Sequence, residues 1–136
     1  MDNQLLQLER DDKHKIKPDY EIWNKSVECV SRDEMSDIQS RRLIQTVQRI
    51  YHKIPSYRNK MQEVGLVPGD IHSIEDLSNL PFTNKSDLRD NYPFGMFTVP
   101  MSEIVRVHAS SGTTGKPTVV GYTRNDLAMW SEVVTR

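Results

Sequence analysis

The sequence predicts an α+β fold in which a helix-rich amino-terminal part is followed by a β-hairpin. Apolar side chains recur at helical spacing between residues 33 and 64. Two short runs of alternating or β-branched residues, 104–109 and 118–122, flank a loop of small polar residues. Because a helix repeats every 3.6 residues and a strand every two, this change of period marks the change from helices to the hairpin.

The composition limits both the core and the partners. The chain has 136 residues, of which 36% are hydrophobic, and its mean hydropathy is -0.64. Ordinary globular domains contain about 45–50% apolar residues, glycine included. The core is therefore expected to be thin, or to be completed by other polypeptide. The net charge of -1 creates no field that would attract nucleic acid or a membrane surface, and neither partner is expected.

Residues that commonly bind metals are few and scattered. Cys29 is the only cysteine, which excludes an internal disulfide and a cysteine-based zinc site and is typical of a reducing compartment. His14, His52 and His72 are too far apart to indicate a metal site, so no metal site is predicted. No apolar run is long enough for a signal peptide or a membrane helix. These features predict a soluble, cytoplasmic protein.

Two helices are predicted in the first half of the chain. The first runs from Asp33 and ends at Ile54, because Pro55 disfavours helical geometry in the residue before it. The second covers about 56–64 and ends at Gly65, which can adopt a left-handed conformation. The apolar stripe of the first helix consists of Leu43, Val47, Ile50 and Ile54.

Polar residues mark further helix starts. Ser73 and Asp76 have the spacing of a capping box, and Asn84 can cap a short helix after it. Thr123 with Asp126 resembles a third start. The helix that follows it carries an apolar face of Leu127, Trp130 and Val134.

The alternation of residues predicts the hairpin. Residues 104–109 are interpreted as a half-exposed strand, and 118–122 as its antiparallel partner, rich in β-branched and aromatic side chains. On the first strand, Val105, Val107 and Ala109 share one side, and Arg106 and His108 share the other.

Three parts are expected along the chain. These are a polar arm over 1–18, a helical subregion over 19–100, and a part over 101–136 that holds the hairpin, its loop and the start of a helix. No helix-stopping residue follows Val134. With the low apolar content, this favours a fragment of a larger domain, whose last helix packs its apolar face on further chain. A small complete domain is the alternative.

The loop between the strands is rich in hydrogen-bond donors and contains no acid. Glycine lets successive backbone amides point into one concavity that binds anions, and a lysine adds a positive charge. The loop lacks the Walker A pattern, because Ser110 stands where that motif needs glycine and Pro117 follows the lysine. A plain solvated hairpin turn is the alternative to a phosphate site. The predicted ATP- and phosphate-binding residues are Ser110, Ser111, Gly112, Thr113, Thr114, Gly115 and Lys116, with His108, Pro117 and Thr118 as support for the loop.

The stretch SSGTTGKPT, residues 110–118, resembles the signature loop of the adenylate-forming enzymes, the acyl-CoA synthetase superfamily. Most members carry lysine after the proline, whereas here Lys116 precedes Pro117 and Thr118 follows it. That order is similar to the phenylacetate-CoA ligase branch, as are LPFTNKSDLRDNYPFGMF at 80–97 and RLIQTVQRIYHKIPSYRNKM at 42–61.

The resemblance implies an ATP-dependent ligase of arylacetate breakdown. In such enzymes ATP and an aryl acid give an acyl-adenylate and pyrophosphate, and coenzyme A then displaces AMP; Mg²⁺ accompanies the ATP. It implies that this chain is an amino-terminal part of the large domain of an α/β enzyme. No catalytic residue is assigned in this part, and the part alone is not expected to turn over. A homodimer is consistent with the resemblance. A noncatalytic helical interaction module whose loop binds phosphate incidentally is the alternative function.

Other polar residues have simpler interpretations. No acid lies between Ile38 and Gln62, and the six cations there could contact coenzyme A phosphates, a subunit or nucleic acid. A solvated helix face is the simpler interpretation. Asp87 and Asp90 fit a helix surface better than acid–base catalysis. The cations are Arg41, Arg42, Arg49, Lys53, Arg58 and Lys60.

Overall fold

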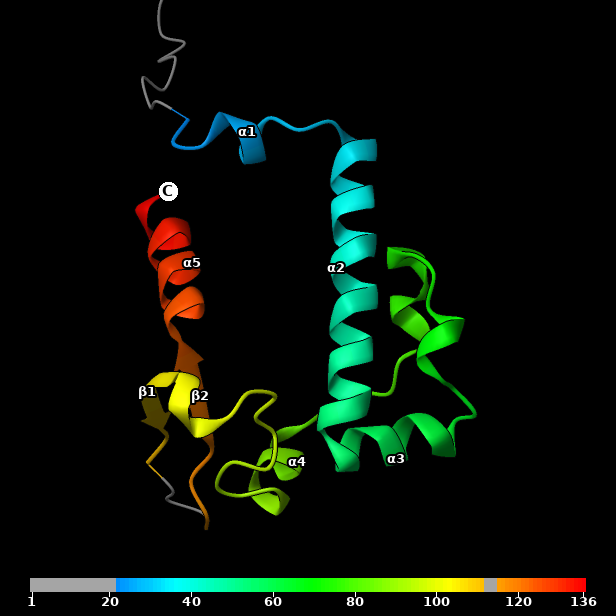
Figure 1. Ribbon diagram of the computed structural model, residues 1–136, viewed down its shortest axis with the longest axis vertical. Helices are drawn as coiled ribbons and strands as arrows, with labels where there is room; N and C mark the ends of the chain where they lie inside the picture. Colours follow the sequence, from blue (N-terminus) through cyan, green and yellow to red (C-terminus); the bar gives the residue numbers. More distant parts are fainter. Residues whose placement is uncertain (1–21, 112–114) are drawn as a thin grey trace, which may run out of the picture.

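A computed structural model describes residues 22–111 and 115–136 and consists of helices followed by one antiparallel hairpin (Figure 1). The long helix α2 stands upright, α3 crosses its lower end, and the hairpin and α5 lie on the opposite side of α2 from η2 and η3. In chain order the elements are α1 Lys25–Glu28, α2 Arg32–Lys53, α3 Pro55–Glu63, η2 Pro68–Asp70, η3 Ile74–Asn79, α4 Lys85–Asp90, η4 Met101–Glu103, β1 Ile104–Ala109, β2 Val119–Thr123 and α5 Arg124–Thr135.

The boundaries of α2 and α3 follow from local chemistry. Ser31 caps α2, with its hydroxyl accepting a hydrogen bond from the Glu34 amide at 3.2 Å. Pro55 ends α2 as expected and also begins α3, one residue earlier than predicted, because the first position of a helix needs no N–H donor. Gly65 follows α3 with φ +73°, which confirms the left-handed cap.

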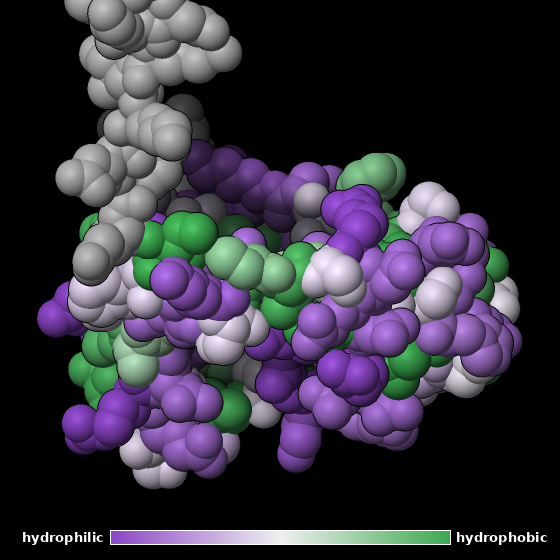
Figure 2. Space-filling model, turned by 90° about the horizontal axis from the view of Figure 1, so that it is seen from above, coloured by the Kyte–Doolittle hydropathy of each residue, from purple (hydrophilic) through white to green (hydrophobic). Residues whose placement is uncertain are grey.

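The core lies where α2, α3 and the segment after η2 meet. Its buried residues include two of the predicted stripe, Val47 and Ile54, and the other two, Leu43 and Ile50, pack against them. Met61 is fully buried. Among the described residues, the buried apolar set is Val47, Ile54, Tyr57, Met61 and Ile71. This core is thin, as the composition predicts, and apolar side chains reach the surface among polar ones (Figure 2).

Contacts from α3 hold the segment that leads to the hairpin. The Tyr57 hydroxyl donates to the Pro81 carbonyl at 3.0 Å, and burial raises the pKa of this phenol. Lys60 forms an ion pair with Asp87 at 2.7 Å and donates to the Phe82 carbonyl at 3.3 Å. The ammonium of Lys60 and the Asn84 amide lower the pKa of the Asp87 carboxyl. These contacts fix the chain between the core and α4.

At all three helix starts predicted from polar residues, those residues cap a helix in the structure. The Ser73 and Asp76 pair and Asn84 form capping boxes at η3 and α4. At the start of α5, Thr123 accepts from the Asp126 amide at 3.2 Å, and the Asp126 carboxylate accepts from the Thr123 amide at 2.8 Å. Such pairs use the N–H groups that have no partner inside the first turn of a helix.

The hairpin pairs Arg106 with Tyr122 and Ala109 with Val119, which agrees with the predicted antiparallel partners. Val105 and Val107, which the sequence assigns to the apolar side of β1, are 49% and 45% exposed, and the strand pairing is irregular between Ile104 and Arg106. The prediction of a half-exposed strand is therefore wrong in extent, because every residue of β1 from Val105 to Ala109 is exposed. Alternation shows which side chains share a face, but it does not supply a layer to cover that face.

Phe97 packs directly on the hairpin at Gly121. A Cβ atom built on Gly121 would lie 2.6 Å from the Phe97 ring, which real contacts do not allow. The ring also contacts Phe94, at 5.2 Å between centroids. Gly121 is therefore needed for close approach.

The ends of the described chain are joined at α1 and α5. The Trp23 indole N–H and the Asn24 amide donate to the Glu132 carboxylate at 3.2 and 3.0 Å. Arg136 pairs with Glu28 at 3.0 Å. Within the described residues, no helix combines the length and apolar character needed to cross a membrane.

Gly121→Ala should lower the free energy of unfolding by about 1–3 kcal/mol, because the added methyl displaces the Phe97 ring. Urea unfolding monitored by tryptophan fluorescence measures this cost. In a Phe97→Ala background the same glycine substitution should cost much less, since the 2.6 Å clash is gone and only the contact with Ile104 Cδ1 at 3.2 Å remains. Equal costs in the two backgrounds would show that Phe97 is not the reason for the glycine.

Candidate functional site

The candidate site is the loop that joins β1 to β2. Ser110 and Thr118 form the neck of this loop. They continue the strand pairing, because the Ser110 amide donates to the Thr118 carbonyl at 3.0 Å. The two hydroxyls of Ser110 and Thr118 lie 2.9 Å apart and share a hydrogen bond. The Thr118 amide donates to the Ser110 hydroxyl oxygen at 3.1 Å. Ser110 and Thr118 thus close the loop at its base.

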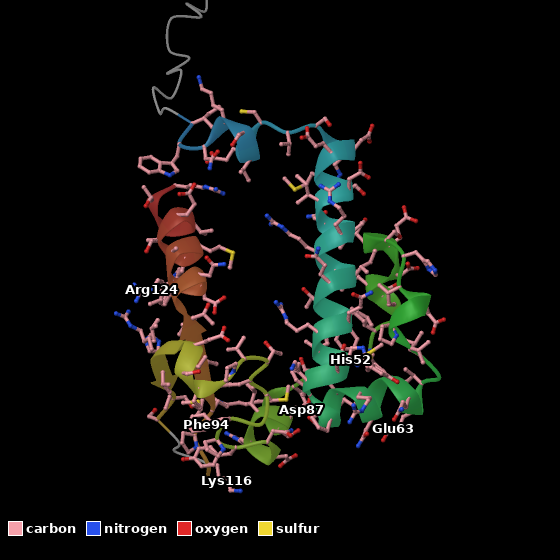
Figure 3. All side chains as sticks on the ribbon, in the orientation of Figure 1. His52, Glu63, Asp87, Phe94, Lys116 and Arg124 are labelled. Atoms are coloured by element: carbon pink, nitrogen blue, oxygen red, sulfur yellow. The ribbon has the colours of Figure 1, made fainter. Side chains whose placement is uncertain are left out.

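The far side of the loop turns at Gly115. Its φ of +128° lies in a region that other residues rarely adopt, and a Cβ there would meet no atom within 4 Å. The requirement for glycine at this position is therefore one of backbone conformation. Lys116 follows it and is exposed at the tip of the hairpin, at the end away from Arg124 and α5 (Figure 3).

The structure describes only part of the predicted phosphate-binding set. Ser110, Ser111, Gly115 and Lys116 are described and lie on the loop, whereas 112–114, the predicted Gly112, Thr113 and Thr114, lie outside the described residues. The hydroxyl of Ser110 already takes part in the neck, which favours a role in shaping the loop. The assignment of ligands within the loop stays a prediction.

His108 belongs to a cluster of three rings below the loop. Its ring centroid lies 5.2 Å from that of Tyr122 and 6.2 Å from that of Trp130, with edge-on geometry in both cases. Tyr122 and Trp130 stack at 5.4 Å. The side of β1 that carries His108 therefore packs on α5. The cluster links the base of the loop to that helix, and sequence alternation alone had assigned His108 only to the polar side.

A cleft of about 800 Å³ lies between α2 and the start of α5. Arg49 of α2 and the capping residue Asp126 both line it, although they are far apart in sequence. The hydrogen bonds from Thr123 lower the pKa of the Asp126 carboxyl, and the positive charge of Arg49 lowers it further. The rest of its polar lining includes Glu103, Arg124 and Asn125. No sequence pattern connects Arg49 with Asp126, so sequence reasoning missed this cleft.

The remaining candidates have structural partners or scattered positions. Lys60 and Asp87 pair with each other, so one member of the cationic strip is neutralised locally. Arg41, Arg42 and Lys53 are exposed along α2. Across residues 22–111 and 115–136, no cluster of three or more histidine, cysteine or acidic side chains could hold a metal ion.

Comparison with known proteins confirms the predicted resemblance. The chain is 50% identical over 115 residues to a phenylacetate-coenzyme A ligase of Thermus thermophilus, covering 85% of this chain and 26% of the relative. It is 51% identical over 110 residues to the corresponding ligase of Escherichia coli, covering 81% of this chain and 25% of the relative. The chain thus spans about a quarter of the length of the curated relatives it matches. No family model matches the chain.

Solved structures confirm the α+β fold class with a hairpin after the helices. A 2-hydroxyisobutyryl-CoA ligase in complex with 2-HIB-AMP and CoA, in the thioesterification state, superposes with a TM-score of 0.69 at 35% identity. The match covers 76% of this chain and 23% of that one. An open conformation of the same ligase gives a TM-score of 0.67 at 34% identity.

The Asp126→Asn variant should lose less stability than the unsubstituted protein as the pH falls. Because the folded pKa of Asp126 is lowered, its contribution is complete above the ordinary value of 3.8 and is lost as the pH falls through the lower folded pKa. Asparagine keeps a hydrogen-bond acceptor but does not titrate. Melting temperatures from pH 7 to about pH 2 should therefore fall less steeply in the variant, with part of the slope remaining from other carboxylates. Identical slopes would mean that Asp126 does not contribute.

Proposed function

We propose that this chain carries the triphosphate-binding hairpin of an ATP-dependent arylacetate-CoA ligase. The observation that supports it most is the closed neck of Ser110 and Thr118 with the turn at Gly115, in a sequence about half identical to phenylacetate-coenzyme A ligases. The loop presents donors without an acid, as a strongly negative triphosphate requires.

In the proposed reaction an aryl-acetate carboxylate oxygen attacks the α-phosphorus of ATP. The bond to the β-phosphate oxygen breaks, and an acyl-adenylate and pyrophosphate result. The coenzyme A thiol then attacks the acyl carbon, the thiol proton is lost, and AMP leaves. The chemistry at the α-phosphorus builds negative charge on the departing pyrophosphate.

The loop would hold the β- and γ-phosphates and the leaving pyrophosphate. Lys116 would supply positive charge, while Ser111 and the loop amides donate hydrogen bonds that strengthen as charge develops. Thr113 and Thr114 are proposed as further donors. Ser110, Thr118, Pro117 and His108 would act by shaping and supporting the loop. Mg²⁺ would enter bound to ATP, as the resemblance implies.

The second candidate is a noncatalytic interaction module whose loop binds phosphate only incidentally. The exposed apolar side chains of α5 favour this alternative, since contiguous exposed apolar surface marks sites of association. Nucleotide binding separates the two candidates, because a module of this kind has no need of the lysine in the loop.

Lys116→Ala should weaken the binding of MgATP by about tenfold or more, because one charge-assisted contact is worth about 1.5–3 kcal/mol. Isothermal titration of the folded chain measures the affinity. Lys85→Ala is the matched control, since it removes the same charge from an exposed position at the start of α4. Equal losses in both variants would indicate general electrostatic attraction and would contradict the proposed site.

The 136-residue chain alone should not turn over. Its matched relatives are about three times as long, and no described residue has been assigned to the acyl or thiol-transfer steps. A coupled assay for pyrophosphate, with ATP, phenylacetate, coenzyme A and Mg²⁺, should stay at background. Sustained release that depends on phenylacetate would contradict this expectation.

A further inference from the structure

Trp130 of α5 contacts two rings of the hairpin. Its indole stacks on Tyr122 of β2 at 5.4 Å between ring centroids, with an angle of 25° between the planes. It meets the imidazole of His108 on β1 edge-on, at 6.2 Å and 69°. Tyr122 in turn meets His108 edge-on at 5.2 Å. These distances lie in the range of attractive ring contacts. The direct contact of Trp130 and its contact through Tyr122 therefore converge on His108.

His108 lies just below the closed neck of the loop. It pairs with Val120 across the hairpin, two residues before the neck formed by Ser110 and Thr118. Because side chains two residues apart in a strand point to the same face, His108 shares its face with Ser110. The three rings thus pack on the face of the hairpin that carries the Ser110 hydroxyl, which forms one half of the side-chain hydrogen bond at the neck.

The opposite face of the hairpin is covered by a different ring. Gly121 precedes Tyr122 in β2, so its Cβ direction points to the other face. A Cβ atom built there would meet the Phe97 ring at 2.6 Å. Phe97 and Trp130 thus contact the hairpin from opposite sides. Since neither strand contains a buried residue, these ring contacts provide much of the packing that orients the hairpin.

The helix that carries this tryptophan, α5, is fixed at both of its ends. At its start, the Thr123 amide and hydroxyl both donate to the Asp126 carboxylate at 2.8 Å. Near its end, the Glu132 carboxylate accepts from the Trp23 indole N–H at 3.2 Å and from the Asn24 amide at 3.0 Å. The helix therefore presents its indole to the strands from a defined position.

We propose that Trp130 is a positioning residue for the phosphate loop. Acting through His108, it holds the end of β1 in the orientation in which Ser110 and Thr118 close the neck and Lys116 follows the turn. The described ring contacts of Trp130 stop at His108, so its effect on a bound anion is indirect. This role rests on the proposed function, because the orientation of the loop matters for activity only if the loop binds phosphate.

Substitutions of Trp130 test this role in the folded chain. Trp130→Ala should weaken the binding of MgATP about threefold to tenfold in isothermal titration, which is the factor that corresponds to the loss of one aromatic pair. Trp130→Phe keeps a ring and should retain most of the affinity. Val134→Ala is the matched control, since it removes an apolar side chain that is 71% exposed on the same helix. Equal losses in Trp130→Ala and Val134→Ala, or no rescue by phenylalanine, would overturn the proposal.

A double substitution tests the route through His108. In a His108→Ala background, Trp130→Ala should cause little further loss of affinity, because the contact through which it acts is already absent. A further loss as large as that of Trp130→Ala alone would reveal an independent effect and would overturn the proposal. Circular dichroism and urea unfolding check that each variant is folded.

The emission of Trp130 gives a readout that does not require its removal. The chain has two tryptophans, so Trp23→Phe leaves Trp130 as the only indole. Saturation with magnesium tripolyphosphate, which lacks the absorbance of adenine, should change the emission. Lys116→Ala should move the midpoint of this change to higher concentration. Unchanged emission while calorimetry detects binding of the same anion would overturn the proposal.

Amide signals separate this proposal from the proposed function. In nuclear magnetic resonance spectra without nucleotide, Trp130→Ala should shift the amides of Ser110 and Lys116 more than Val134→Ala does. Equal shifts would overturn the positioning role even if the chain binds MgATP. Shifted amides in a chain that binds no MgATP would contradict the proposed function and would support the positioning of the loop by Trp130.

Discussion

The contact between Phe97 and Gly121 determines where the hairpin stands, and the loop depends on the hairpin. The core is confined to α2, α3 and the segment after η2, so the hairpin takes its position from the chain that connects it to that core. Tyr57 and Asp87 fix the beginning of this connection through the Pro81 carbonyl and Lys60. Met96 packs against the core, and Phe97, the next residue, packs on the hairpin. Because these two adjacent residues contact the core and the hairpin respectively, they fix the position of the strands relative to the helices.

The candidate site itself is built from short-range geometry. Ser110 and Thr118 close the loop, and Gly115 supplies a conformation available at little cost only to glycine. The rings of His108 and Tyr122 connect the strands below the loop to Trp130 on α5. A displacement of α5 would therefore reach the base of the loop through these rings, which gives the helix a structural connection to the proposed phosphate site.

Features that depend on neighbouring residues could be predicted from the sequence. The cap of Thr123 and Asp126 needs two residues three positions apart, and the turn at Gly65 needs one glycine after a predicted helix, so both are confirmed. The loop could be singled out for the same reason, since its donors form one continuous segment. Which residues of the loop bind an anion stays a prediction.

Long-range contacts could not be predicted in this way. Lys60 with Asp87, and Arg49 with Asp126 across the cleft, come together only because α2 and α3 turn at Pro55 and the later chain returns to them. The exposure of Val107 has a related cause. A strand with one apolar side predicts a covering layer, but whether that layer exists depends on polypeptide elsewhere.

Lys116 stands between Gly115 and Pro117, and this order has an entropic consequence. Proline restricts the residue before it to extended backbone conformations, and Gly115 is already in an unusual one. Ordering the backbone of a single residue costs about 1–2 kcal/mol. The covalent sequence has thus removed much of the main-chain freedom of this lysine before an anion arrives, and the flexibility left to be lost on binding resides mainly in its methylene chain.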